Sequence, residues 1–427
     1  MRQVLQRIIA IVLLSILAIG PSGCAGLGVT ATPEPVTLKF AVAEGSMPIQ
    51  RLAEEFHAKY PWITIQYYEV GYSGGNSIEQ WVRSGGVDLF RTSREAMGWI
   101  DDGLLKPMDD IQLDDFSEIR SDYYSGLWDA LALEGVQYGV PAGMDVYVAY
   151  VNTQQAQALG VDLPKDDWDK IEFYEFVKSL NGWNPSGMSE SSLIGFCTDP
   201  QSMDPLVYVY SHGGTIVDSI EDPRQATLDD PLTIEATQSY ADLFNRDQLS
   251  PTREVARKLF PRGGVYEAEI RGQCGAWFNW FSERGGSGTG MLSWQNQWKM
   301  YNLPHDNRDM AMGNVEGYYL AGSSDYPEEA LVFIRWLSDR WDAAGTLIPP
   351  RISQQQDDGY RESLGKELTA VVDAFPKEVI FLPGSYTPEL EAVGTAYFKA
   401  VGQIIAEDVP ADGVLKEAQD SLRSAFE

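Results

Sequence analysis

The first clear pattern along the chain is a strand, a helix and a second strand within residues 36–70. Apolar and polar residues alternate through residues 36–43 (VTLKFAVA) and again through residues 63–70 (ITIQYYEV), which predicts two strands. Between them, residues 48–60 place apolar side chains at helical spacing, and Pro61 ends that helix. A strand–helix–strand unit of this length predicts parallel strands joined by a right-handed crossover.

Similar patterns continue along the chain and predict an α/β fold with more than one lobe. The further elements expected are strands at residues 87–90 and 147–151 and helices at residues 168–180, 327–337 and 389–426, the last with a break at 408–413. Asp167 directly precedes the first of these helices and is expected to be its N-cap. Because ligands of open α/β sheets bind beyond the carboxyl ends of the strands, we expect a site in the loops after Ala43, Phe90 and Val140.

The N-terminus has the pattern of an export signal. Arg2 and Arg7 precede residues 8–19, an apolar run that is too short for a comfortable transmembrane helix and suited to a signal-peptide core. The rest of the sequence holds no apolar run long enough to span a bilayer. The protein is therefore expected outside the cytoplasm.

Small residues that end in a cysteine follow the apolar run and are similar to a bacterial lipobox. This similarity predicts removal of residues 1–23 and lipidation of Cys24, with residues 24–36 as a tether to the folded part. Pro21 departs from the usual aliphatic residue at its position, and a plain signal peptide cut nearby is the alternative.

The composition is strongly acidic: 62 Asp and Glu against 32 Lys and Arg give a formal net charge of −30 over 427 residues. Such a field repels phosphate backbones, because nucleic-acid affinity comes largely from cations that displace counterions. It also disfavours docking on anionic lipid through a basic face. Nucleic acid is therefore excluded as a partner.

With 44% hydrophobic residues the chain is globular, and its length indicates two or three domains.

The sequence offers little for catalysis. The three histidines, His57, His212 and His305, lie far apart and in no zinc-binding spacing. The chain also lacks the phosphate-binding pattern GxxxxGK[ST]. We therefore expect no metal and no cofactor. Two of the 62 carboxylates could still form a pair suited to glycoside hydrolysis, so an exported carbohydrate-active enzyme stays as an alternative.

After Cys24 the chain contains two further cysteines, Cys197 and Cys274, with no CxxC motif. This count excludes a scaffold held together by several disulfides. One bridge between the two residues and a pair of buried thiols are both compatible with the sequence.

Residues 275–281 (GAWFNWF) are rich in aromatic side chains. In an extended segment these residues alternate between two faces, with Trp277 and Asn279 on one face and Trp280 on the other. Such density is typical of a protein core. In the functional interpretation, one or two rings line a cleft and stack on the apolar face of a sugar, while nearby amides and carboxylates bind its hydroxyls.

Six blocks of sequence, in this order, resemble one protein family. They are residues 36–65, 87–110, 135–180, 271–280, 317–339 and 346–353. The block at 135–180, with GVQYGVP at its start and WDKIEFYEFVKSL at its end, is the most diagnostic. The chain resembles bacterial family 1 extracellular solute-binding proteins, the maltose-binding-protein-like receptors of ATP-driven sugar importers. The opening strand departs from the family pattern, because KFAVA lacks an expected sugar-stacking ring.

The resemblance implies a two-lobed periplasmic-binding-protein fold, in which each lobe is a mainly parallel sheet flanked by helices and the ligand cleft lies at the hinge. The expected limits are residues 37–143 and 314–347 for the first lobe, 148–312 and 350–427 for the second lobe, and 144–147 and 314–318 for the hinge strands.

The resemblance also implies a function. An extracytoplasmic lipoprotein of this family captures a sugar by lobe closure and delivers it to the permease subunits of an ABC importer, which a cytoplasmic ATPase drives. The expected protein is a monomer without enzymatic activity. It is held by the lipid on Cys24 at the outer face of the cytoplasmic membrane or in the periplasm. The alternative to transport, besides an enzyme, is a surface lipoprotein with aromatic residues in its core and acids as a solubility coat.

Carried over position by position, the resemblance predicts the ligand-binding residues. Glu44 follows the first strand, and Asp145 lies seven residues before Asn152, where members of this fold reach a sugar hydroxyl. These two acids disfavour an anionic ligand, while a cation such as a polyamine remains compatible with them. The whole predicted set comprises Glu44, Gly45, Ser46, Thr92, Ser93, Arg94, Asp145, Trp277, Asn279, Trp280, Tyr318, Arg351, Tyr386 and Tyr397.

Overall fold

The computed structural model describes residues 34–71, 77–109, 114–124, 126–184, 193–220, 223–286, 293–376, 379–381 and 387–426. The predicted signal peptide, the lipidation residue Cys24 and the predicted site residue Tyr386 lie outside the described residues.

The chain begins with the expected strand–helix–strand unit. Strand β1 (Val36–Ala43) and strand β2 (Ile63–Val70) have the predicted limits, and they pair in parallel from Val36 opposite Ile63. Helix α2 (Ile49–Lys59) joins them and buries its apolar stripe, which includes Leu52 and Phe56. The local pattern alone was sufficient to predict this unit.

The described strands form one continuous mixed sheet with the order β2-β1-β3-β10-β6-β8-β7. Strands β1, β2 and β3 are parallel, and β7 is parallel to β8, whereas the long strands β6 and β10 run antiparallel to their neighbours in this order. Strand β11 pairs with β10, and β9 with β6. The limits not yet given are β3 (Leu89–Ser93), β6 (Gly139–Asn152), β7 (Ile194–Cys197), β8 (Cys274–Trp280), β9 (Trp298–Tyr301), β10 (Ala311–Leu320) and β11 (Val379–Phe381), with a separate hairpin of β4 (Ala132–Leu133) and β5 (Val136–Gln137).

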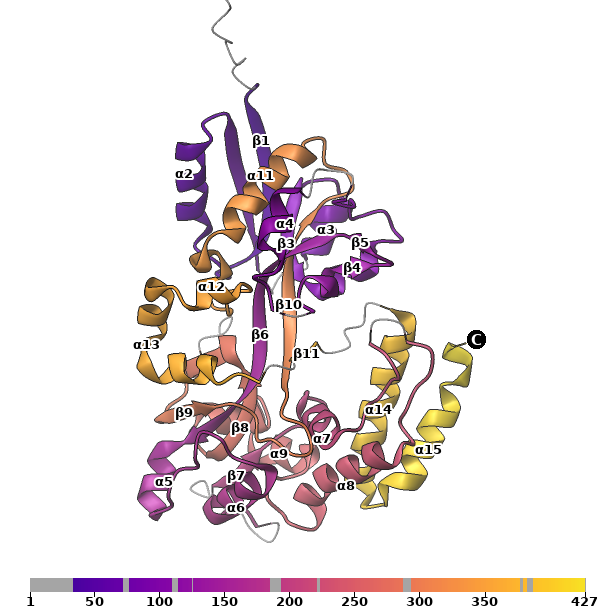
Figure 1. The fold of residues 1–427 in the computed structure, drawn as a ribbon. Helices are drawn as coiled ribbons and strands as arrows, with labels where there is room; N and C mark the ends of the chain where they lie inside the picture. Colours follow the sequence, from indigo (N-terminus) through magenta and orange to yellow (C-terminus); the bar gives the residue numbers. More distant parts are fainter. Residues whose placement is uncertain are drawn as a thin grey trace, which may run out of the picture.

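Two long strands connect two lobes (Figure 1). Residues 139–146 of β6 pair with β10, whereas residues 147–152 pair with β8 and β9. The first lobe is built around β1, β2, β3 and the adjoining halves of β6 and β10. The second lobe is built around β7, β8, β9 and the remainder of β6. The loop expected after Val140 was a wrong prediction, because β6 continues without a break to Asn152.

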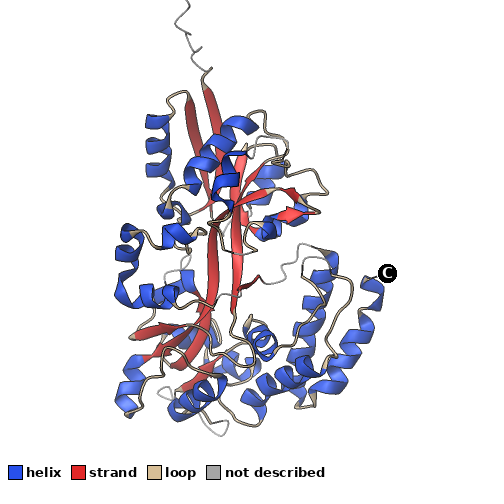
Figure 2. Ribbon diagram, viewed as in Figure 1, coloured by secondary structure: helices blue, strands red, loops and turns tan. Residues whose placement is uncertain are grey.

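Helices cover both lobes, as Figure 2 shows. In the first lobe they are α3 (Ile78–Arg83), η1 (Arg94–Trp99), α4 (Asp114–Arg120), η2 (Asp129–Leu131), α11 (Pro327–Ser338) and η4 (Trp341–Ala344). In the second lobe they are α5 (Thr153–Leu159), α6 (Lys170–Leu180), α7 (Asp204–His212), α8 (Pro231–Asn245), α9 (Arg253–Leu259), α10 (Val265–Ile270), η3 (Phe281–Gly286), α14 (Pro388–Glu407), α15 (Ala411–Ser421) and η5 (Arg423–Ala425). Helices α12 (Ile352–Gln355) and α13 (Asp358–Asp373) lie between the two groups (Figure 1).

Helix α11 closes the core of the first lobe although it comes almost 300 residues after β1 in the sequence. The ring of Phe333 lies 5.6 Å from Phe40 of β1 and 4.7 Å from Phe56 of α2, measured between centroids. All three side chains are fully buried. Burial of this kind contributes roughly 2 kcal/mol per large apolar side chain, so the first lobe depends on this distant helix.

The start of α6 differs from the prediction by two residues. Asp169, not Asp167, is the N-cap, and its carboxylate accepts hydrogen bonds from the backbone N–H groups of Ile171 (2.9 Å) and Glu172 (2.8 Å). Trp168 lies outside the helix because its indole is buried and donates a hydrogen bond to the carbonyl of Asn302. A partner this distant in sequence decides where the helix begins.

Cys197 and Cys274 form a disulfide that joins β7 to β8, which are paired strands of the second lobe. Of the two alternatives that the sequence left open, the structure therefore has the bridge. Among the described residues, the helices are all too short or too polar to cross a membrane.

Candidate functional site

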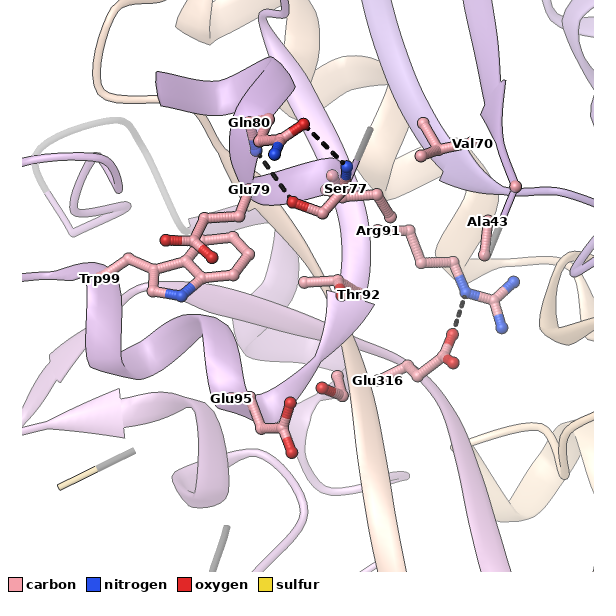
Figure 3. A pocket seen from close by; sticks show the side chains of 13 residues that line it. Ala43, Val70, Ser77, Glu79, Gln80, Arg91, Thr92, Glu95, Trp99 and Glu316 are labelled. Carbon is pink, nitrogen blue, oxygen red and sulfur yellow. Dashed lines mark hydrogen bonds and ion pairs between the residues drawn. The ribbon is translucent and has the colours of Figure 1, made fainter. Parts of the chain in front are cut away.

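A cavity of about 580 Å³ lies at the carboxyl ends of β1, β2 and β3 in the first lobe. This is the edge at which the topology of an α/β sheet places ligands. Figure 3 shows the cavity and the side chains that line it. The lining residues are Ala43, Val70, Gly71, Ser77, Ile78, Glu79, Gln80, Arg91, Thr92, Ser93, Glu95, Trp99 and Glu316.

An ion pair between a buried arginine and a partly exposed glutamate forms one wall of this cavity. Arg91, with 1% of its side chain exposed, donates to Oε2 of Glu316 at 2.7 Å. It also donates to the carbonyl oxygens of Ala343 (2.9 Å) and Ala344 (3.0 Å) in η4. Arg91 is therefore fully used in holding β3, β10 and η4 together, and it fixes the carboxylate of Glu316 at the cavity surface.

An aromatic ring and two further acids line another part of the cavity. Trp99, at the end of η1, stacks on the buried ring of Phe90 with 5.8 Å between centroids. Glu79 and Glu95 line the same cavity as Trp99, and Figure 3 draws Glu79 near the indole in this view and Glu95 below it. A partly exposed indole rimmed by carboxylates can stack on a sugar ring and accept hydrogen bonds from its hydroxyls.

The pairing of the strands relates Glu316 of this cavity to residues nearer the second lobe. Directly paired residues of antiparallel strands share a face, and so do residues two apart in one strand. Glu316 pairs with Ser93 and with Gly143, and Tyr147 pairs with Trp280. Glu316, Asp145 and Tyr147 therefore lie on one face of the sheet, in a line that crosses between the lobes.

Asp145 contacts the second lobe directly. Its carboxylate accepts hydrogen bonds from the backbone N–H of Ser282 at 3.0 Å and from Ser282 Oγ at 2.5 Å. Burial raises the pKa of Asp145 to about 7, and the nearby carboxylates of Glu316 and Glu283 act in the same direction against the hydrogen bonds from Ser282. Asp145 is therefore an acid at the junction of the lobes whose charge depends on pH near neutrality.

The second lobe places further acids at the end of this line. The hydroxyl of Tyr147 donates to Asp204 at 2.9 Å, and Thr198 donates to the same carboxylate. Burial raises the pKa of Asp204 to about 7. Glu269 of α10 lies near Asp204, and burial raises its pKa well above the usual range of a glutamate. Trp280 is half-buried here, with its ring edge-on to Tyr147 at 5.0 Å.

Comparison with known proteins decides the family. Residues 43–340, well over half of the chain, match the family described as bacterial extracellular solute-binding protein. This protein belongs to that family. The resemblance seen in the sequence is thus confirmed, and so is the two-lobed α/β fold.

Solved structures of solute-binding proteins share the fold of this one. An ABC substrate-binding protein from Listeria monocytogenes, in complex with cycloalternan, has a TM-score of 0.72 at 15% identity, over 92% of this chain and 99% of that one. The GacH receptor of Streptomyces glaucescens, studied unliganded and with acarbose, has a TM-score of 0.69 at 17% identity, over 92% and 99%. The protein CpMnBP1 with mannobiose bound has a TM-score of 0.64 at 17% identity, over 91% and 100%.

The structure of this solute-binding protein brings some of the predicted site residues together. Thr92 and Ser93 line the 580 Å³ cavity. Glu44, Gly45 and Ser46 form the adjacent turn after β1, where Oε2 of Glu44 lies 3.0 Å from the position that a Cβ atom on Gly71 would occupy. The prediction that the loops after β1 and β3 share one edge of the sheet is therefore consistent with the geometry.

Arg94 lies elsewhere. It lines a second cavity, of about 430 Å³, to which both lobes contribute. From the second lobe this cavity is lined by Tyr210, Thr215 and residues 217–220, and by β11. Arg94 thus points away from its neighbours Thr92 and Ser93.

The other predicted residues form contacts within the protein in this conformation. Trp277 is fully buried and stacks on Tyr150 at 5.7 Å, and Tyr397 is fully buried with its hydroxyl 3.2 Å from that of Thr237. Tyr318 is buried, and its hydroxyl donates a hydrogen bond to the carbonyl of Ala343. Arg351 forms ion pairs with Asp122 and Asp339. The side chain of Asn279 accepts a hydrogen bond from the backbone N–H of Trp280. Of the two aromatic residues predicted from residues 275–281, only Trp280 has a partly exposed ring.

Sequence reasoning did not find Trp99, Glu79, Glu95, Arg91 or Glu316. Glu95 follows the predicted residues 92–94 directly and Trp99 comes four residues later, so their place in the same block was the available signal. Glu316 lies in the predicted hinge strand, but its position beside the cavity depends on the pairing of β10 with β3.

Proposed function

We propose that this protein is the substrate-binding component of an ABC importer, which captures a sugar between its lobes and delivers it to the permease. The observation that carries this proposal is the 580 Å³ cavity, where a tryptophan, hydroxyl groups and carboxylates converge beside the strands that connect the lobes. Binding, closure and release require no bond chemistry, and the relatives with a shared fold bind saccharides or acarbose.

Closure follows from the placement of the cavity. The lobes in this proposal comprise residues 37–143 with 314–347 and residues 148–312 with 350–427, and they hinge at residues 144–147 and 314–318. A ligand held on the first lobe by Trp99, Thr92 and Ser93 gains contacts from Trp280 of the second lobe when the hinge bends. Each carboxylate that bonds a hydroxyl in the closed state selects for stereochemistry, because one left unpaired there costs about 1–3 kcal/mol.

The proposal includes the cellular setting. The signal peptide directs export, the lipid on Cys24 anchors a monomer at the membrane, and residues 24–36 leave the lobes free to reach the permease. Intact mass of the protein from membranes of the native host would test this part, because a diacylated Cys24 at the N-terminus has a distinct mass.

The test of sugar binding uses the protein from Ala25 onward and calorimetric titration with glucose, maltotetraose, mannobiose, cellobiose and cycloalternan. Binding of one of these sugars without its consumption is the expected result. Trp99→Ala should weaken that binding by about tenfold or more, since ring stacking contributes on the order of 1 kcal/mol beyond its buried area.

Trp62→Ala is the matched control, because Trp62 precedes β2 at the opposite end of the same sheet and packs on Tyr60. Thr92→Val and Thr395→Val form a second pair, one threonine in the cavity and one in a surface cavity on α14. Equal effects of the cavity variants and their controls would place the ligand elsewhere. Consumption of the sugar during titration would identify an enzyme instead.

A further inference from the structure

The ion pair between Arg91 and Glu316 leaves one carboxylate oxygen available to the cavity of the first lobe. From this geometry we infer that Glu316 and its strand partner Ser93 recognise two adjacent hydroxyl groups of the sugar, and that Arg91 is the positioning residue for this contact. The inference rests on the proposed function and specifies which feature of the sugar determines selectivity.

Arg91 fixes the position of the Glu316 carboxylate. Its Nε donates to Oε2 of Glu316 at 2.7 Å, and its two Nη atoms donate to the carbonyl oxygens of Ala343 and Ala344 at 2.9 and 3.0 Å. All three nitrogens of the guanidinium are therefore engaged, and only 1% of the side chain is exposed. An arginine held at three points orients its partner before a ligand arrives, which lowers the entropy cost of binding.

Glu316 keeps an acceptor for the ligand. It lines the 580 Å³ cavity, and 29% of its side chain is exposed. Oε2 takes the bond from Arg91, whereas Oε1 forms no hydrogen bond or ion pair with any group in the part of the chain that the structure describes. Figure 3 draws the ion pair as a dashed line among the residues that line the cavity. A carboxylate oxygen accepts stronger hydrogen bonds than a neutral acceptor does.

The charge of this contact suits a neutral ligand. The positive charge of Arg91 balances the negative charge of Glu316, so the pair as a whole is neutral. A hydroxyl group satisfies Oε1 without a further counterion, whereas a ligand cation at the same oxygen would be repelled by the nearby guanidinium. The pair therefore favours the hydroxyl groups of a sugar over an ammonium group.

Ser93 lies beside Glu316 on the neighbouring strand. The two residues are directly paired in the antiparallel ladder of β3 and β10, and both line the cavity. Directly paired residues present their side chains on one face of the sheet, with Cβ atoms roughly 5 Å apart. A carboxylate oxygen and a hydroxyl group in this arrangement can bond two hydroxyls on neighbouring carbons of one sugar ring, while Trp99 in the same cavity packs against the ring.

An irregularity in the sheet occurs at the same residue. Glu316 pairs with Gly143 of β6, whereas Gly317 pairs with Pro141. Ala142 is therefore an additional residue on β6, which makes a β-bulge. Bulges re-aim side chains and are frequent beside functional sites. This observation is independent of the ion pair, and it also points to Glu316.

Calorimetric titration of Glu316→Gln tests the contact. The probes are glucose, maltotetraose, mannobiose, cellobiose, cycloalternan and lactose, of which lactose differs from cellobiose only in the configuration of one hydroxyl. Glu316→Gln should weaken the sugar that the wild type binds most tightly by about tenfold or more, because it removes the charged acceptor. It should also reduce the preference for that sugar over the others, because selectivity depends on a hydroxyl in the configuration that reaches Oε1.

Glu55→Gln is the matched control. Glu55 of α2 also pairs with arginines, Arg51 and Arg340, and 40% of its side chain is exposed, but it is not among the residues that line the cavity. Sugar binding should be unchanged in this variant. Equal binding by Glu316→Gln and Glu55→Gln overturns the inference.

Ser93→Ala tests the second hydroxyl contact. The variant should weaken binding of the same sugar, because one of the two adjacent hydroxyls loses its partner. Unchanged binding would overturn recognition of a hydroxyl pair.

Arg91→Gln tests the positioning role. It should weaken binding in the wild-type background but have little further effect in the Glu316→Gln background, because Arg91 acts through Glu316. Separate, additive losses would show a structural role alone and overturn the assignment of Arg91. Glu316→Gln preserves the size of a partly exposed side chain, so it tests the inference even if replacement of the buried Arg91 impairs folding.

Failure of the inference and failure of the proposed function are distinguishable. A wild type that binds one of these sugars through Trp99, with no dependence on Glu316, leaves the receptor in place and overturns the inference. A wild type that binds none of them contradicts the proposed function as well.

Discussion

Gly345 lies against the turn that follows β1, and both its backbone conformation and its close contact with that turn require glycine. Its backbone has φ +71° and ψ −120°, and a Cβ atom on it would lie 1.8 Å from the carbonyl oxygen of Ser46. Only glycine populates this conformation readily, and only glycine leaves room for that oxygen. The segment after η4 therefore sets the position of the turn that carries Glu44.

Gly345→Ala is expected to reduce the free energy of unfolding by about 3 kcal/mol or more, because strain and a backbone clash add. The control is Gly45→Ala, since Gly45 has the same φ of +71° but open space around its Cβ position. That variant should lose only about 1 kcal/mol, the cost of a left-handed backbone. Urea unfolding measures both, and similar losses would show that Ser46 does not approach Gly345 closely.

Asp204 should make stability depend on pH. Burial raises its pKa from 3.8 to about 7, so the folded protein binds this proton more tightly than the unfolded chain. The stability gained from that proton is present at acidic pH and is lost as the pH rises from about 4 to about 7, by at most about 4 kcal/mol. Asp204→Asn removes this titration.

Urea unfolding at about pH 5 and about pH 8 tests this prediction. The free energy of unfolding of Asp204→Asn minus that of the wild type should be larger at the higher pH than at the lower pH. Asp145 retains its own titration, so part of the pH dependence stays. Asp412→Asn, an exposed acid of α15, should show no such change. The same stability difference at both pH values would contradict the assignment to Asp204.

At the scale of elements, the disulfide between β7 and β8 closes a long segment of chain. Cys197 and Cys274 are 77 residues apart, and a cross-link over such a loop stabilises the folded state by about 4 kcal/mol through restriction of the unfolded chain. The Cys197→Ala/Cys274→Ala double variant should lose about that much in urea unfolding without reductant. The wild type with reductant should match it. Equal stability of the oxidised wild type and the variant would show that the bridge is absent from the folded protein.

The sequence predicts an element well when nearby residues determine its limits, and less well when residues distant in the sequence do. Strands β1 and β2 have their predicted limits because alternation within eight residues determines them. The start of α6 was misplaced because Trp168 bonds a carbonyl 134 residues away. Strand β6 is longer than its pattern indicated, because it is buried along almost its whole length and so lacks the alternation of a half-exposed strand.

The same reasoning separates the site residues that were predicted from those that were not. Thr92 and Ser93 follow from a local rule, since residues at the carboxyl end of a parallel strand reach the ligand edge. Trp277 has the residue type expected of a sugar platform, but Tyr150 and Trp294 cover it, and those contacts are long-range. Glu316 reaches the cavity only through the pairing of β10 with β3, which no local pattern specifies.

At the scale of the whole molecule, two paired strands form the connection between the lobes. Residues 139–146 of β6 and 313–319 of β10 are hydrogen-bonded to each other, so the connection can bend while its register resists sliding. The lobes should therefore approach each other as rigid bodies when a ligand binds. Small-angle scattering should show a smaller radius of gyration with the bound sugar than without it.

The Trp99→Ala protein with the same sugar is the control for closure, because weaker binding should leave it in the free conformation. An unchanged radius of gyration for the wild type, at a sugar concentration that saturates calorimetric binding, would exclude closure.

The late position of α11 in the sequence has a consequence for synthesis of the protein. A chain made from its N-terminus produces β1, β2, β3 and half of β6 early, but Phe333 and strand β10, which complete their core, come only after the entire second-lobe segment from β7 to β9. Until residue 338 has been made, the first lobe exposes the apolar surfaces of Phe40 and Phe56. The order of the elements thus leaves the core of the first lobe incomplete until most of the polypeptide has been made.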